Sequence, residues 1–259
     1  MNPKYDCLKC SLDDRVLTLS FNRPDVLNAV NETMHSELAS VFYDIALNDE
    51  VDVVVLTGEG RAFSAGGDLD MMQRMLESPQ RYKRGNIEGK RIVYSLLELE
   101  KPIICKLNGD AIGLGATVAL LCDVILADEN VRIADPHVRV GLVAGDGGAL
   151  IWPQLLGYAR AKEFLMSGTF LTATQAKELG LINHVYPADQ LDAEVTKMAR
   201  QWADGPIAAI SWTKTVINQG LKQAMHSIMD TGMAYEALST YEDAHRQAVE
   251  RLTERERGR

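Results

Sequence analysis

Long apolar runs are missing from this chain of 259 residues, and none approaches the roughly 18 residues that a membrane-spanning helix requires. The N-terminal stretch MNPKYDCLKC also lacks the basic and then apolar pattern of a secretory signal. Lysines and arginines total 27 against 36 aspartates and glutamates, and basic runs are as short as RYKRG at 81–85. Because a nucleic-acid-binding protein normally presents a basic face, we expect neither nucleic acid nor membrane as a partner, and a cytoplasmic location.

Cysteine is also scarce. The four cysteines, at 7, 10, 105 and 122, are too few for a disulfide framework in a chain of this length. The spacing Cys7-x-x-Cys10 occurs in zinc and redox sites, but it lies in the alternating run YDCLKCSL, which is typical of a strand. Positions three apart on a strand face opposite sides, and no second Cys or His pair completes a metal site. We therefore expect no metal and a reducing compartment.

Strand-like and helical segments alternate in the first half of the chain. The expected strands lie at 5–10, 15–21, 51–58, 102–109 and 123–128. The last three are continuous apolar runs, which are typical of buried parallel strands. Asn31 precedes a stripe of apolar residues with helical spacing and is a favourable N-cap. This order predicts an α/β fold with a mainly parallel sheet.

From about residue 147 onward the pattern becomes helical. The expected helices lie at 147–157, 158–167, 174–180, 188–204, 206–220 and 221–253, with LINHV at 181–185 as a lone strand. Gly220 and Gly232 are expected to interrupt the last stretch. We predict a core at 1–204 and a helical C-terminal region at 205–259, with a boundary at Gly205-Pro206.

Two glycine-rich loops follow two of the buried strands. AFSAGGDL follows VVVLTG, and NGDAIGLGATVALL follows PIICKL. They match neither a dinucleotide fingerprint nor a P-loop, and Ser64 lacks the leading glycine of a nucleophile elbow. Loops at the carboxyl ends of parallel strands are where α/β folds bind ligands. Two backbone N–H groups that converge there would form an oxyanion hole.

The order of motifs resembles the crotonase superfamily, also called the enoyl-CoA hydratase/isomerase family. The motifs are RPDVLNAV (23–30), GRAFSAGGDL (60–69), KPIICKLNGDAIGLG (101–115), a D-P-x-x-x-x-G segment and LTATQAKELGLINHV. The resemblance implies a crotonase-like spiral of ββα units with a helical C-terminal trimerisation region, in a homotrimer or a hexamer that is a dimer of trimers. It also implies an acyl-CoA substrate, with coenzyme A as part of the substrate and no separate cofactor.

The resemblance assigns roles to individual positions. It places the two oxyanion-hole donors on Gly67 and Leu114. It places the following residues along the pantetheine and adenine of coenzyme A: Leu27, Ala29, Ala65, Asp68 and Leu69.

Two acidic residues of the family's hydratases are missing. Their two glutamates fall on Thr117 and His137 here. Thr117 cannot act as an acid or base near neutral pH, although its hydroxyl could hold a water near the substrate. His137 has an ordinary pKa near 6.5, which suits a general base, and Asp146 would orient it.

A second resemblance favours a different reaction. The segments GDGGALIWPQLLG (145–157) and GMAYEAL (232–238) are similar to oxocamphor hydrolase, a divergent member of the same superfamily. That enzyme cleaves a carbon–carbon bond between two carbonyl groups without coenzyme A, and the similarity places Glu236 in the active site. The alternatives to a hydratase or isomerase are therefore a carbon–carbon bond hydrolase with a β-dicarbonyl substrate and a non-catalytic acyl-CoA-binding protein.

Simpler roles for the same side chains also fit the sequence. His137 could be a solvated loop residue, Asp146 a helix N-cap, and Glu236 a solvated helix residue. The remaining histidines, His35, His184, His226 and His245, are expected to be structural or on the surface.

Overall fold

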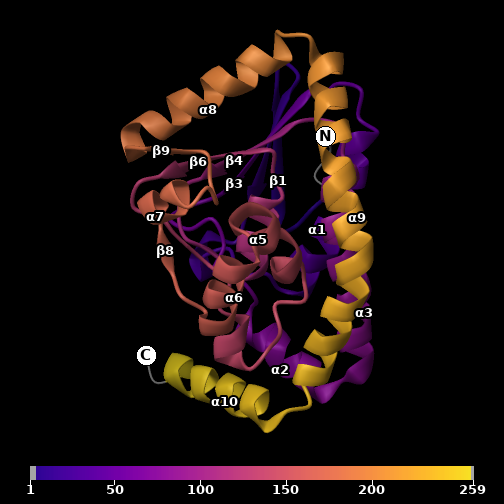
Figure 1. The fold of residues 1–259 in the computed structure, drawn as a ribbon, viewed down its shortest axis with the longest axis vertical. Coiled ribbons are helices and arrows are strands. Elements are labelled where there is room, and N and C mark those ends of the chain that lie inside the picture. Colours follow the sequence, from indigo (N-terminus) through magenta and orange to yellow (C-terminus); the bar gives the residue numbers. More distant parts are fainter. Residues whose placement is uncertain (1–3, 258–259) are drawn as a thin grey trace.

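A mainly parallel sheet organises the protein, as the sequence predicts. The computed structural model describes residues 4–257, and within them the larger sheet has the strand order β1-β2-β3-β4-β6-β9 (Figure 1). Only β1 and β2 are antiparallel; the other neighbours run parallel. The strands are β1 (Leu8–Asp13), β2 (Val16–Phe21), β3 (Val53–Gly58), β4 (Ile103–Leu107), β6 (Val124–Asp128) and β9 (His184–Tyr186).

Helices cover both faces of this sheet. They are η1 (Pro24–Val26), α1 (Glu32–Ala46), α2 (Leu69–Glu77), α3 (Pro79–Glu98), α4 (Leu114–Leu120), η2 (His137–Val140), α5 (Gly148–Leu156), α6 (Tyr158–Ser167), α7 (Ala173–Glu178), α8 (Ala188–Ala203), α9 (Ile207–Ser239) and α10 (Asp243–Arg257). The predicted cap of α1 is confirmed, because the Asn31 side chain accepts a hydrogen bond from Met34 N. The region from 69 to 98, predicted as one helical segment, consists of two helices that meet at Ser78.

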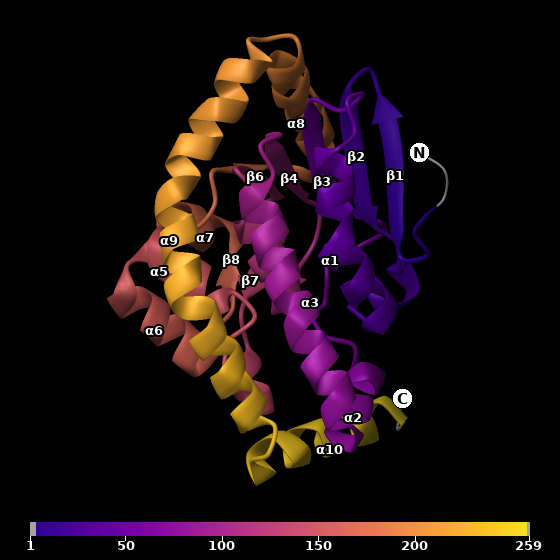
Figure 2. The same ribbon diagram turned by 90° about the vertical axis from the view of Figure 1, so that its right-hand side faces the viewer.

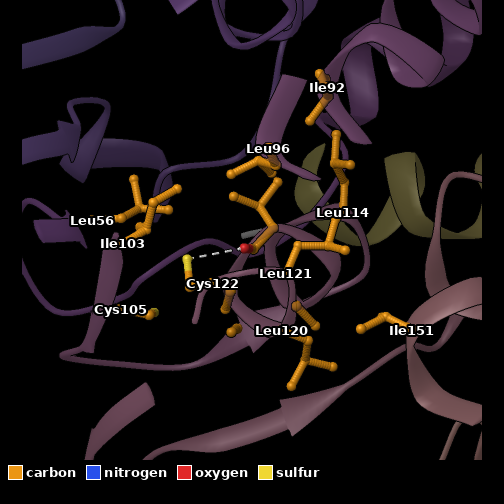
Figure 3. Packing of buried hydrophobic residues seen from close by; sticks show 14 of the residues in the cluster. Leu56, Ile92, Leu96, Ile103, Cys105, Leu114, Leu120, Leu121, Cys122 and Ile151 are labelled. Carbon is orange, nitrogen blue, oxygen red and sulfur yellow. Dashed lines mark hydrogen bonds between the residues drawn. The ribbon is translucent and has the colours of Figure 1, made fainter. Parts of the chain in front are cut away.

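The continuous apolar run of β3 is buried on both sides, as expected for a central parallel strand. Val54 and Leu56 belong to the larger core cluster, with α1, α3 and α4. Val53 and Val55 face the opposite side, in a smaller cluster with apolar residues of α8. Figure 3 shows part of the larger cluster, in which Ile92 and Leu96 of α3 gather with Leu114 and Leu120 of α4.

A second sheet, absent from the sequence predictions, positions the second glycine loop. It has the order β5-β7-β8 and contains β5 (Ala111–Ile112), β7 (Arg132–Ala134) and β8 (Leu171–Thr172). Its strands have two or three residues, too few for an alternating pattern to be recognised. The parallel pair β5–β7 joins Ile112 to Ala134, and Gly113 N donates to Ala134 O at 3.0 Å. The segment that contains Asp135 and His137 therefore lies beside the glycine loop.

The prediction that glycines interrupt the C-terminal region is wrong. A single helix, α9, runs through Gly220 and Gly232 and ends at Ser239. A glycine costs only about 1 kcal/mol in a helix, and α9 packs along α3 and α5, which outweighs that cost (Figure 2). The turn to α10 comes instead at 240–242, and α10 returns across α2. The C-terminal helical region itself is confirmed. No helix of the described part of the chain is long and apolar enough to cross a membrane.

Candidate active site

The two glycine loops are joined through their backbones. Ser64 N donates to Asp110 O, and Ile112 N donates to Ser64 O, each at 3.0 Å. The Ser64 side chain is fully buried and donates to Asn28 O at 2.8 Å, so Ser64 has a structural role. Gly115 allows this approach, because a Cβ there would lie 2.6 Å from Ser64 Cβ. Both loops thus face one shared space at the carboxyl ends of β3 and β4.

The two predicted oxyanion-hole positions lie at this shared space. Gly67 and Leu114 line the same inner chamber. Leu114 is the first residue of α4, where helical N–H groups have no intrahelical partner. Within residues 4–257, the N–H of neither residue donates a hydrogen bond to another protein group. Both donors are therefore free to bind a ligand oxygen.

An outer groove of about 570 Å³ leads to this point. It is lined by all five positions that the family resemblance assigns to coenzyme A: Leu27, Ala29, Ala65, Asp68 and Leu69. Its wall is held in shape by Asn28, whose buried amide donates to the backbone oxygens of Glu59 and Ala62 at 2.9 and 2.8 Å. An ion pair of 3.0 Å between Arg23 and Asp68 joins the same two loops.

The inner chamber continues from the groove, since both are lined by Gly67, Asp68, Met72 and His137. Its volume is about 100 Å³, and it also contains Asp146 and Glu236. Further lining residues are Val30, His35, Met71, Met75, Leu76, Tyr82, Gly85, Asn86, Gly89, Leu142, Met233, Thr240 and His245.

Thr117, expected near the substrate, lines neither cavity. It lies one turn into α4 and is fully buried with its methyl group towards Gly147, where a Cβ would lie 2.6 Å from Thr117 Cγ2. Its hydroxyl has no hydrogen-bond partner within the described chain.

His137 lies between two aspartates. Its Nδ1 is hydrogen-bonded to Asp135 Oδ1, and its Nε2 lies 3.4 Å from Asp146 Oδ2. The side chain of His137 is only 13% exposed, so the interpretation as a solvated loop residue is wrong. Asp146 is not the N-cap of α5 either, because that position belongs to Gly147.

The contact with Asp135 was missed from the sequence. An aspartate side chain commonly accepts a hydrogen bond from the backbone N–H two residues later in the chain. Asp135 does so here, because its Oδ1 accepts from His137 N at 3.4 Å. The sequence D-P-H could therefore have predicted the contact between Asp135 and His137, because the two residues are close in the chain.

The charges of this trio depend on one another. Burial lowers the pKa of His137, but the adjacent carboxylates of Asp135 and Asp146 outweigh it and raise that pKa well above 6.5. Burial raises the pKa of Asp146, and His137 outweighs this effect and lowers it. At neutral pH the pair is therefore an imidazolium and a carboxylate.

Glu236 enters the chamber from α9. A Cβ on Gly145 would overlap Gly232 O, so these two glycines allow α9 to contact the loop before α5 directly. One helical turn after Gly232, the carboxyl group of Glu236 lies beside this loop, and its Oε2 has no hydrogen-bond partner among the described residues. Burial, followed by the charge of Asp146, raises the pKa of Glu236 to about 8. The interpretation as a solvated helix residue is therefore wrong.

Two other histidines are closer to the site than expected. His35 Nδ1 lies 3.1 Å from Glu88 Oε2, and His245 Nδ1 donates to Val140 O at 2.6 Å. Both line the inner chamber. His226 is exposed, as predicted.

Asp135, His137 and Asp146 each offer one atom of a potential metal site within 4.8 Å of the others. However, the two carboxylates face different nitrogens of the ring. A metal ion bound to one nitrogen would therefore be out of reach of the carboxylate on the other side of the ring. An imidazolium can instead donate one N–H to each carboxylate. The trio fits a protonated histidine better than a metal.

Comparisons with known proteins identify the family and the fold. The chain matches the family Enoyl-CoA hydratase/isomerase over residues 12–257. It is 32% identical to 1,2-epoxyphenylacetyl-CoA isomerase of Escherichia coli K12 over 236 residues, which is 90% of each chain. The crystal structure of an enoyl-CoA hydratase/isomerase from Mycobacterium paratuberculosis superposes with a TM-score of 0.93 at 34% identity, covering 96% of this chain and 99% of that one. A β-diketone hydrolase from Anabaena sp. PCC 7120, bound to (S)-3-oxocyclohexyl acetic acid, superposes with a TM-score of 0.85 at 32% identity, covering 92% and 95%. This protein belongs to the enoyl-CoA hydratase/isomerase family, the crotonase superfamily.

Proposed function

We propose that this protein is an enzyme that acts on an acyl-CoA thioester through an enolate, as a hydratase or isomerase. The observation that carries the proposal is the position of His137 and Asp146 in the chamber that Gly67 and Leu114 also line. The outer groove has the place and the lining expected for coenzyme A, which would be bound as part of the substrate.

In this proposal the thioester oxygen accepts hydrogen bonds from Gly67 N–H and Leu114 N–H. These donors are fixed by the backbone before the substrate arrives, so they stabilise the charge that develops on the oxygen without reorganisation. One such donor typically contributes about 10²–10³-fold to the rate.

His137 and Asp146 together replace the two missing glutamates. In hydration, Asp146 accepts a proton from water while the water oxygen adds to the β-carbon. The His137 imidazolium then gives its Nε2 proton to the α-carbon of the enolate. Because the pKa of His137 is raised and that of Asp146 is lowered, the proton returns from Asp146 to His137 and restores the pair.

This scheme assigns the orienting role to Asp135 and not to Asp146. Asp135 holds Nδ1, so Nε2 is the nitrogen that meets Asp146 and the substrate. A histidine held by a third group through its other nitrogen is also found in a catalytic triad. In this scheme, however, His137 acts as the acid and Asp146 as the base, whereas the sequence suggested His137 as the base.

Hydrolysis of a carbon–carbon bond in a β-dicarbonyl compound is the second candidate. Positions 117 and 137, where the family's hydratases have glutamates, are threonine and histidine here, and this favours the second candidate. The similarity to the Anabaena β-diketone hydrolase also favours it. The same pair would deliver water to one carbonyl carbon. The bond to the central carbon would then break, the enolate would leave into the Gly67 and Leu114 site, and His137 would protonate its carbon.

Loss of the enoyl-thioester absorbance of crotonyl-CoA tests the first candidate, with wild type and His137→Ala side by side. Turnover by wild type that His137→Ala abolishes supports it. No turnover by wild type contradicts hydration, and a panel of β-dicarbonyl compounds then tests the second candidate. A protein that turns over neither panel but binds acyl-CoA equally well with and without His137 would be a non-catalytic binder.

A further inference from the structure

One face of α3 forms a wall of the inner chamber. The four chamber-lining residues of this helix, Tyr82, Gly85, Asn86 and Gly89, have the spacing of a single helical face. Two of the four have no side chain, and this removes volume from the wall. A Cβ at Gly85 would lie 2.8 Å from Met75 Cε, and a Cβ at Gly89 would lie 3.3 Å from Met233 Cε.

The methionines opposite this wall can adapt to different shapes, because their unbranched thioether side chains have three rotatable bonds. Met71, Met72, Met75 and Met233 all line the chamber. Met75 and Met233 fill the space beside the two glycines, so rotation of these flexible side chains would enlarge the chamber of about 100 Å³.

The polar atoms of the chamber indicate what kind of group this is. Tyr82 Oη lies 3.5 Å from Glu236 Oε1, at the limit of a hydrogen bond. Glu236 Oε2 is buried and has no partner within residues 4–257. Burial is the main effect that raises the pKa of Tyr82, so its hydroxyl keeps its proton. The pKa of Glu236 is raised to about 8, so its carboxyl group is also protonated at neutral pH and can donate. A hydrocarbon chain would offer these two donors no acceptor, which is unfavourable for buried polar groups.

We propose that the inner chamber is a subsite for an acyl group that carries a second oxygen atom, which Tyr82 and Glu236 bind. Gly85 and Gly89 leave room for the side chains of Met75 and Met233, whose rotation makes the space for that group. Tyr82 determines specificity and takes no part in proton transfer. The inference rests on the proposed function, because it places the thioester at Gly67 and Leu114.

The two ligands that test this inference differ mainly in one carbonyl oxygen: butanoyl-CoA and 3-oxobutanoyl-CoA. Their dissociation constants are measured by calorimetry in the His137→Ala background, so that neither is turned over. Tyr82→Phe removes only the hydroxyl group. Tyr94→Phe is the matched control, because Tyr94 lies on the same helix but contacts His226 outside the chamber.

We expect about tenfold tighter binding of 3-oxobutanoyl-CoA than of butanoyl-CoA, since one hydrogen bond to a buried group changes affinity by about this factor. Tyr82→Phe reduces the preference to less than about twofold, and Tyr94→Phe preserves it. Equal binding of the two ligands, or a preference that survives Tyr82→Phe, overturns the inference alone. If neither thioester binds, both the proposed function and this inference are wrong.

Discussion

His137 Nε2 lies 3.4 Å from Asp146 Oδ2, although nine positions separate the two residues in the sequence. Asp135 binds the opposite nitrogen, so the imidazole is fixed from both sides. The pair faces the chamber in which two backbone N–H groups are free. In the proposed function, this pair handles protons in place of the two glutamates of the hydratases.

Asp135→Asn tests the orienting contact. The amide cannot stabilise the imidazolium as the carboxylate does, so the pKa of His137 falls and the ring can adopt other orientations. We expect kcat to fall by about 10²–10⁴-fold while the dissociation constant of the substrate changes little. Asp110→Asn, at an exposed ion pair with Arg132, is the control. An unchanged kcat in Asp135→Asn would contradict the role of Asp135.

Glu236 is predicted to make stability depend on pH. Its pKa is raised from 4.5 to about 8 in the folded protein, so the folded state binds more protons than the unfolded state between these values. The free energy of unfolding therefore falls as pH rises from 4.5 to 8. Glu236→Gln removes this term, so its stability relative to wild type increases with pH over the same interval, on the order of 1 kcal/mol per pH unit.

Chemical denaturation of both proteins at pH 5 and pH 8 measures this difference. Glu250→Gln, on the exposed face of α10, provides the comparison and should show no such trend. A difference between Glu236→Gln and wild type that is constant with pH would show that Glu236 is ionised in the folded protein.

Gly145→Ala is predicted to separate α9 from the active-site loop. The added methyl group would overlap Gly232 O and lie 2.9 Å from Glu236 Oε2. We expect destabilisation of about 1–3 kcal/mol, together with loss of activity, because overpacking forces the backbone apart. Gly220→Ala on the same helix meets no atom within 4 Å and should stabilise α9 by about 1 kcal/mol. Equal effects of the two substitutions would contradict this account of the glycine contact.

A buried ion pair attaches the other end of α9 to the sheet. Lys214 Nζ lies 2.9 Å from Asp123 Oδ2 and also donates to Lys101 O, and its side chain is 6% exposed. Lys214→Ala leaves Asp123 buried without its partner and should lower the free energy of unfolding by about 3–5 kcal/mol. Lys222→Ala, at a partly exposed position of α9, should change it by less than about 0.5 kcal/mol. A small effect of Lys214→Ala in urea unfolding would show that the pair does not anchor the helix.

The exposed apolar face of α9 supports the prediction of a trimer or a hexamer. Trp212, Val216 and Ile217 are 64%, 72% and 68% exposed in the single chain, and such a patch normally marks an interface. Light scattering should give three or six times the protomer mass of 28.6 kDa. Trp212→Asp should shift the protein to smaller species. A monomeric wild type would contradict the prediction.

The sequence predicts the parts of the fold that depend on regular patterns. The apolar run of β3, the cap at Asn31 and the two glycine loops are all found where the patterns indicate. Contacts between distant segments leave no such pattern. The approach of Gly145 to Gly232 and the position of Tyr82 in the chamber depend on how α3 and α9 pack. The continuity of α9 also depends on packing, because its glycines alone favour a break.

The pH dependence of kcat/KM, on crotonyl-CoA or on whichever β-dicarbonyl compound is turned over, tests the central claim most directly. If His137 donates its proton and Asp146 accepts one, the active form is the imidazolium with the carboxylate. We predict that kcat/KM falls as pH rises through the raised pKa of His137, and that Asp135→Asn moves this decline to lower pH. An increase of kcat/KM through the same range would contradict the account, because it would show that the neutral imidazole is the active form.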